Sequence, residues 1–148
     1  MEMWEVIARE SIRDIVARYN ANGDTGRIPQ VMELFADDAV METGTAEGGM
    51  RTYTGKAEVE SIFTGAIGTF GEAAKARKGP PWLRHCTATH QIDFVDKTHA
   101  KGRCYYFVLM YHGLDHWGRY IDQYEERDGR WLFTYRKVTT DSRHDWTD

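Results

Sequence analysis

The sequence has few cysteines and no long apolar run, and both absences limit what the chain can be. Its two cysteines, Cys86 and Cys104, lack the spacing of metal ligands and lie in apolar segments rich in β-branched residues, so we interpret them as small buried side chains. No stretch approaches the roughly 18 apolar residues of a membrane-spanning helix. The first ten residues, MEMWEVIARE, contain no signal-peptide core. We therefore expect a cytoplasmic protein that makes no membrane contact.

Sequence motifs of several enzyme classes are also missing. The chain has no His-x-His pair, no His-Glu-x-x-His, no Gly-x-Ser-x-Gly and no glycine-rich phosphate loop between a strand and a helix. We therefore expect neither a bound metal nor another cofactor. The 19 basic and 23 acidic residues are interspersed and give a net charge of −4, which does not favour nucleic acid as a partner.

What the chain does have is a globular composition with many aromatic residues. Its 148 residues fit one domain, residues 1–148, with a sizeable core. Hydrophobic residues make up 41% and aromatic residues 13% of the chain, which indicates either a lined cavity or a large interface. A long aromatic sheet exposes an apolar face on a monomer, so we expect a homo-oligomer, a dimer or a trimer.

The first half of the chain has the apolar periodicity of helices. Residues 3–21 predict a first helix, and Asn22-Gly23 provides a stop signal. A short second helix is expected near Pro29, with Phe35 on its apolar face, and a third helix after Gly55. Two short strands are expected between the second and third helices, in the segments DDAVMETG and MRTYTG.

The second half has the pattern of a long antiparallel meander. Residues 68–84 are rich in glycine and contain a Pro-Pro pair, so they predict an irregular connection, either a lid or a surface loop. Long β-rich segments follow, separated by the short turns DKTH, GLD and RDGR. Three helices followed by such a sheet predict an α+β fold in which the helices lie on one curved sheet.

Histidine is the side chain best suited to proton transfer near neutral pH, and His85 is the best placed of six. It begins the first long strand of the meander. Strict alternation places it on one face with Thr87, Thr89, Gln91 and Asp93. That polar row faces either a pocket or solvent. His90 stands on the more apolar opposite face. Four further histidines are expected to be exposed, namely His99, His112, His116 and His144.

The order of elements resembles the NTF2-like superfamily, in particular its SnoaL-like branch. The segments that carry the resemblance are IRDIVARYNANGD, VMELFADDAVME, YTGKAEVESIF, LRHCTATHQI, GRYIDQYEERDGRW and YRKV. The branch includes lyases of the bile-acid 7α-dehydratase, hexachlorocyclohexane dehydrochlorinase and scytalone dehydratase types. The resemblance implies a conical pocket with a catalytic Asp–His dyad, here Asp24 and His85, beside Tyr19. A second tyrosine of the bile-acid enzyme falls on Thr43.

The implied function is a cofactor-independent lyase of the dehydratase type that acts on a hydrophobic, ring-containing small molecule such as a steroid, aryl or polyketide compound. The same base also serves an isomerase, a cyclase or a retro-aldol C–C lyase, and other members of the superfamily bind ligands or proteins without catalysis. The expected substrate-binding residues are Arg136, Tyr53, Tyr106, Tyr120, Trp82 and Trp117.

Overall fold

The structure is a computed structural model that describes residues 1–45, 47–76, 80 and 82–144. In these residues the chain forms an α+β fold with three helices and a six-stranded sheet, which confirms the predicted fold class. The elements are α1 (Met3–Asp24), α2 (Ile28–Met32), β1 (Phe35–Gly44), β2 (Met50–Thr54), α3 (Lys56–Ala76), β3 (Leu83–Phe94), β4 (His99–Met110), β5 (Gly113–Arg127) and β6 (Arg130–Arg143).

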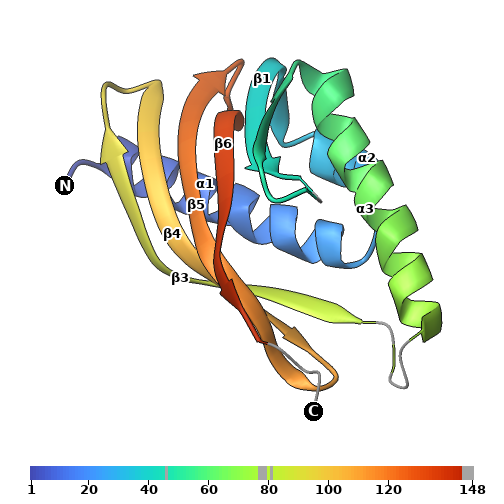
Figure 1. Cartoon of the computed structure of the whole chain (residues 1–148). Coiled ribbons are helices and arrows are strands. Elements are labelled where there is room, and N and C mark those ends of the chain that lie inside the picture. Colours follow the sequence, from blue (N-terminus) through green and yellow to red (C-terminus); the bar gives the residue numbers. More distant parts are fainter. Residues whose placement is uncertain (46, 77–79, 81, 145–148) are drawn as a thin grey trace.

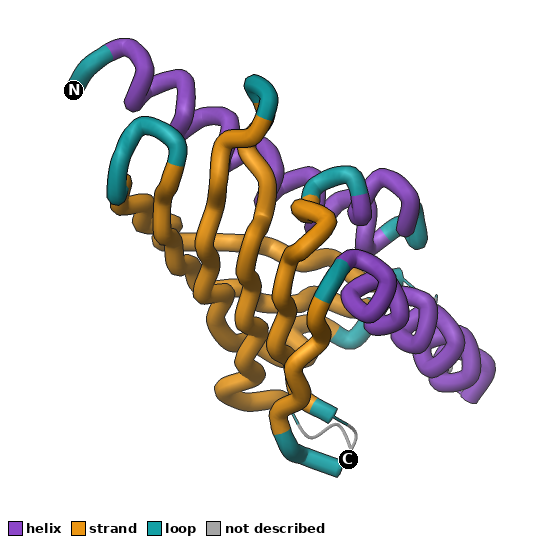
Figure 2. The backbone as a smooth tube through the Cα atoms, turned by 90° about the horizontal axis from the view of Figure 1, so that it is seen from above, coloured by secondary structure: helices purple, strands orange, loops and turns teal. Residues whose placement is uncertain are grey.

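The sheet has the strand order β2-β1-β6-β5-β4-β3. All neighbours are antiparallel except β1 and β6, which run parallel, so the sheet is mixed. The strands curve, and α1 lies across one face of the sheet while α3 stands beside β1 and β2 (Figure 1). Figure 2 shows the strands as one curved layer. The apolar faces of α1 and α2 pack with the concave side of the sheet into one core.

The helix α1 is longer than predicted and includes Asp24 as its last residue. Asn22 and Gly23 do not stop it. The chain leaves the helix at Gly26, whose φ of +71° is a left-handed conformation that glycine adopts without steric cost. The backbone N–H of Arg27 then bonds to the carbonyl of Asn22. The true stop signal is therefore Gly26, three residues beyond the predicted one.

Two further boundaries differ from the prediction. Phe35 does not belong to the second helix but begins β1, where it is buried. The helix α3 continues to Ala76 and so occupies the first half of the segment 68–84 that we expected to be irregular. The sequence EAAKA at its end has strong helix propensity, which outweighs the preceding glycines. Residues 77–79 and 81 lie outside the described part of the chain.

A β-bulge in β3 changes which side chains share a face. The register with β4 shifts between Ala88 and Gln91, and Thr89 has a φ of +57°. His85 pairs with the buried Val108 and therefore faces the concave side, whereas Gln91 faces the outer side. The predicted polar row running from His85 to Asp93 is therefore wrong, because one extra residue reverses the alternation beyond Ala88.

Gly118 marks a second irregular position, where β5 meets β6. A Cβ atom added there would lie 1.8 Å from the carbonyl oxygen of Thr139, and a backbone atom cannot move aside as a side-chain end can. We expect Gly118→Ala to lower the free energy of unfolding by about 3 kcal/mol or more, at the upper end for overpacking. Urea unfolding measures this. Gly23→Ala is the control, since nothing lies within 4 Å of its added Cβ; equal stability of both variants would contradict the prediction.

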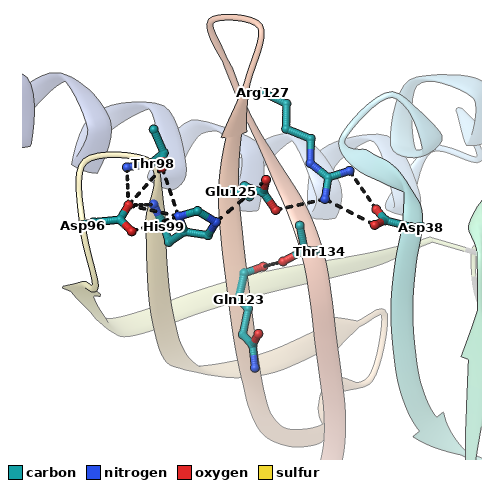
Figure 3. A network of polar contacts seen from close by, with 8 residues as sticks. All are labelled: Asp38, Asp96, Thr98, His99, Gln123, Glu125, Arg127 and Thr134. Carbon is teal, nitrogen blue, oxygen red and sulfur yellow. Dashed lines mark hydrogen bonds and ion pairs between the residues drawn. The ribbon is translucent and has the colours of Figure 1, made fainter.

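A network of polar side chains connects the β3–β4 turn to β5 and β1 (Figure 3). His99 Nδ1 lies 3.0 Å from Asp96, and its Nε2 lies 3.8 Å from Glu125. Arg127 bridges Glu125 and Asp38 with N···O distances of 2.9 and 2.8 Å. These side chains are partly or largely exposed, so each ion pair contributes little by itself. The network orders the rim of the sheet rather than the cavity.

The outer face of the sheet carries exposed apolar side chains, including Tyr105, Leu114 and Ile121. This is the apolar surface that the aromatic sequence predicted, and the oligomeric state stays a prediction. Among the described residues, no helix is long and apolar enough to cross a membrane.

Candidate active site

The candidate site is a cavity of about 530 Å³ between the end of α1, α3 and the concave face of the sheet. That volume is within the usual range for small-molecule sites. Its wall is mostly apolar. The apolar lining residues are Ile28, Met41, Ile62, Phe63, Ala66, Leu83 and Val138. The polar lining residues are Tyr19, Asn20, Asp24, Thr25, Thr43 and His85.

Asp24 and His85 meet at the wall of this cavity. The Nδ1 atom of His85 lies 2.6 Å from Oδ1 of Asp24, and the backbone N–H of His85 donates to Oδ2 over 2.8 Å. The Asp24 side chain is 6% exposed and the His85 side chain 27%. With a carboxylate at Nδ1, the proton sits on that nitrogen and Nε2 is left as the basic atom. The arrangement can therefore act as a general base.

The edge position of β3 explains how this contact forms. β3 pairs only with β4, so backbone N–H groups on its other side need partners outside the sheet. The N–H of His85 finds one in Asp24. Negative charge at a helix C-terminus is unfavourable, because the helix dipole is negative there too. Two hydrogen bonds from one residue offset that cost and fix the carboxylate toward the cavity.

Tyr19 lines the same cavity from the last turns of α1. Its ring makes edge contacts with Phe35, Phe63, Tyr120 and Phe133, which hold it in one orientation. Burial raises the pKa of Tyr19, although the positive charge of Arg136 opposes this. The phenol therefore stays protonated at neutral pH and is a hydrogen-bond donor.

Three of the expected binding residues lie beneath the cavity wall. Tyr106 and Tyr120 stack on each other at 4.6 Å, and the Tyr120 hydroxyl donates to Asn20. Arg136 is fully buried, with its guanidinium carbon 4.2 Å from the centre of the Tyr19 ring. None of the three is among the residues that line the cavity. They support Tyr19 and Asn20 from behind, and their contact with a substrate stays a prediction.

The other three expected binding residues lie elsewhere on the molecule. Trp117 faces a shallow groove on the outer side of the sheet. Trp82 is 37% exposed and has the Arg84 guanidinium over its ring. Tyr53 is on the short edge strand β2, beneath the Arg51 guanidinium. Trp82 and Trp117 are therefore at the outer surface, whereas Tyr53 packs against the core. Aromatic character alone does not tell which side of a strand a ring occupies.

The sequence reasoning missed most of the cavity wall. Asn20 follows Tyr19 on α1, and Met41 faces the cavity from β1. Thr43, where the resemblance places a second tyrosine, faces the cavity from the same strand. Ile62 and Phe63 belong to the apolar stripe of α3, which indicated burial but not a cavity. Among the described residues, no group of three His, Cys, Asp or Glu side chains is arranged to hold a metal ion.

Comparisons with known proteins identify a family and several solved structures of similar fold. A family model described as SnoaL-like domain matches residues 4–137. Among curated proteins, none matches this sequence. A putative scytalone dehydratase from Novosphingobium aromaticivorans is 23% identical with a TM-score of 0.75, over 100% of this chain and 93% of the other. LinA is 18% identical with a TM-score of 0.78, over 98% of this chain and 93% of the other. The hexachlorocyclohexane dehydrochlorinase LinA-type3 from Novosphingobium barchaimii is 17% identical with a TM-score of 0.72, over 97% of this chain and 93% of the other.

Proposed function

Because this chain belongs to the SnoaL-like domain family, we propose that it is a cofactor-independent lyase that eliminates water from a hydrophobic, ring-containing small molecule. The observation that carries the proposal is the 2.6 Å contact between Asp24 and His85 at the wall of an apolar cavity. Structural neighbours named as dehydratase or dehydrochlorinase support an elimination, although each shares under 25% of its residues with this chain.

In the proposed reaction His85 removes a C–H proton that a neighbouring carbonyl makes acidic. The electron pair of that bond forms the new double bond, and the C–O bond breaks with its electron pair on the leaving hydroxide. The hydroxide takes a proton from solvent and departs as water, which matches the proton that His85 removes from the substrate and returns to solvent. Asp24 orients the ring of His85 and balances its positive charge. Tyr19 donates a hydrogen bond to the carbonyl oxygen as negative charge develops on it, and such a donor is worth about 10²–10³-fold in rate.

The residues that line the cavity favour an uncharged ring system as the part of the substrate that enters. Apolar side chains from α2, α3 and the sheet face the space, and the polar groups gather around Asp24, His85 and Asn20. Such an arrangement binds a flat or polycyclic body against the apolar wall and leaves one oxygen near the dyad. An isomerase, a cyclase and a retro-aldol lyase need the same base, so identifying the product distinguishes them.

Proton abstraction is tested without knowing the natural substrate. α-Tetralone, a neutral bicyclic ketone, exchanges its acidic C–H for deuterium in heavy water when a base acts on it. We expect the protein to catalyse this exchange and His85→Gln to slow it by about 10²–10⁴-fold, the usual contribution of a general base. Mass spectrometry of the ketone measures the exchange. His99→Gln, at the other end of the meander, is the control and should leave the rate unchanged.

The β-hydroxylated derivative of α-tetralone tests the elimination itself. Loss of water from it gives an aromatic naphthol that is easily detected. Exchange without elimination would favour an isomerase over a lyase. If His85→Gln exchanged deuterium as fast as the wild-type protein, the proposed role of the dyad would be wrong.

A further inference from the structure

A second histidine–carboxylate pair lies at the β4–β5 turn. Nδ1 of His116 lies 2.7 Å from Oδ2 of Asp115, and Nε2 of His112 lies 2.8 Å from the other carboxylate oxygen. The side chains of His116, Asp115 and His112 are only 23%, 14% and 14% exposed. The sequence prediction that both histidines are exposed is wrong. The tight turn consists only of Tyr111 and His112, and the chain after it folds back onto the sheet with Asp115 and His116.

This pair is adjacent to the candidate active site. Val108 of β4 pairs with His85 on one side and with His116 on the other. The imidazole rings of His85 and His116 have centroids 6.2 Å apart and are nearly perpendicular, at 83°. The ring of Tyr106 lies 6.0 Å from His85 and 6.1 Å from His116, so the three rings form one cluster on the concave side.

Both histidines are oriented in the same way by their carboxylates. In each ring Nδ1 is held by an aspartate, so Nε2 is the atom left to exchange protons. Within the described part of the chain, neither Nε2 has a hydrogen-bond partner. The ring separation is too long for a direct hydrogen bond between the two rings and fits a single bridging water.

The electrostatics around His116 favour its neutral form, in which Nε2 is free of a proton. Burial lowers the pKa of His116, and Asp115 opposes that effect. The groups that face the ring are Asp115, His85 on β3, Tyr106 on β4 and Arg143 on β6. His85 and Arg143 can place positive charge near the ring, which further favours the neutral form of His116. Asp115 is ready to balance the charge that forms when His116 takes a proton.

We propose that His116 is the proton relay of the site: it receives the proton that His85 has removed from the substrate and passes it to solvent at the β4–β5 turn. The N–H bond at Nε2 of the His85 imidazolium breaks, a bridging water carries the proton, and a new N–H bond forms at Nε2 of His116. His85 is neutral again and ready for the next substrate. His116 acts through His85 and does not touch the substrate. This inference rests on the proposed function.

The relay is tested by deuterium exchange into α-tetralone, which requires that His85 release its proton to solvent before returning one. We expect His116→Gln to lower the exchange rate by about 10-fold in dilute buffer, less than the 10²–10⁴-fold of the base itself. Added imidazole should restore the rate, because a free base replaces the relay. Rescue by imidazole separates a relay from a structural role. An undiminished rate for His116→Gln in dilute buffer would overturn the proposal.

A second measurement does not depend on activity. The ring signals of His116 are titrated by NMR in the wild-type protein and in His85→Gln. Because the two ring centroids are only 6.2 Å apart, removing the positive charge that protonated His85 carries should shift the titration of His116 to higher pH. Identical curves would overturn the relay. If α-tetralone is not exchanged by the wild-type protein, the proposed function fails for this probe, and the titration still decides whether the two rings are coupled.

Discussion

Asp24→Asn is expected to lower kcat for elimination by about 10²–10⁴-fold without unfolding the protein. The carboxylate uses both oxygens on His85: Oδ1 accepts from Nδ1 and Oδ2 from the backbone N–H. Asparagine has one acceptor oxygen and an NH₂ group. When its oxygen keeps the backbone hydrogen bond, its NH₂ faces Nδ1 and forces the imidazole proton onto Nε2. The atom that must act as the base is then already protonated.

The measurement compares kcat of Asp24→Asn and of the wild-type protein on the hydroxylated tetralone. The circular dichroism spectrum and the urea unfolding midpoint of each protein show whether it is folded. Asp14→Asn is the matched control, because Asp14 is on the same helix and pairs with Arg18 at an exposed position. That variant should keep both activity and stability. Wild-type kcat in a folded Asp24→Asn protein would show that the carboxylate is not needed to orient His85.

The helices and their apolar faces could be predicted from the sequence because helical periodicity is a local property. The contact between Asp24 and His85 could not, since 61 positions separate the two residues and many acids compete for the histidine. The resemblance to a family selected Asp24, and the structure then placed it in hydrogen-bond contact with His85. The catalytic roles of Asp24, His85 and Tyr19 stay predictions.

Two failures of the sequence reasoning, on the polar row of β3 and on the position of Arg136, share one physical cause, which is an irregular strand. The register of β5 with β6 shifts next to Tyr124, just as that of β3 with β4 shifts beyond Ala88. Strict alternation along β6 would group Arg136 with Leu132 and Thr134, but the shift places it with the buried Phe133 instead. A bulge inserts one residue and reverses every later side chain. No local pattern in these strands indicated where the bulges would be.

Arg136 is therefore a buried ion, and we expect its partner Asp122 to be essential for stability. Its Nε and Nη2 atoms each donate to Asp122 over 2.8 Å, and both side chains are completely buried. The hydroxyl of Tyr124 donates to the same carboxylate at 2.7 Å. Burial by itself would lower the pKa of Arg136, but Asp122 more than offsets this, and the pKa is raised. Because arginine is not deprotonated in proteins, the guanidinium stays charged when Asp122 loses its charge.

Asp122→Asn should lower the free energy of unfolding by about 3–5 kcal/mol, the cost of leaving a buried charge without its counter-ion. Urea unfolding gives this value. Asp141→Asn is the control: Asp141 pairs with Arg119 at an exposed site and should cost less than about 1 kcal/mol.

The double variant Asp122→Leu with Arg136→Met separates charge from packing. Replacing both members of a buried ion pair with apolar side chains of similar volume is often neutral, so the double variant should recover most of the loss. Arg136 also lies against the Tyr19 ring. We therefore expect the activity of the double variant to stay below that of the wild-type protein even when the stability of the double variant returns. Equal instability of the single and double variants would show that shape, and not the unpaired charge, makes this position critical.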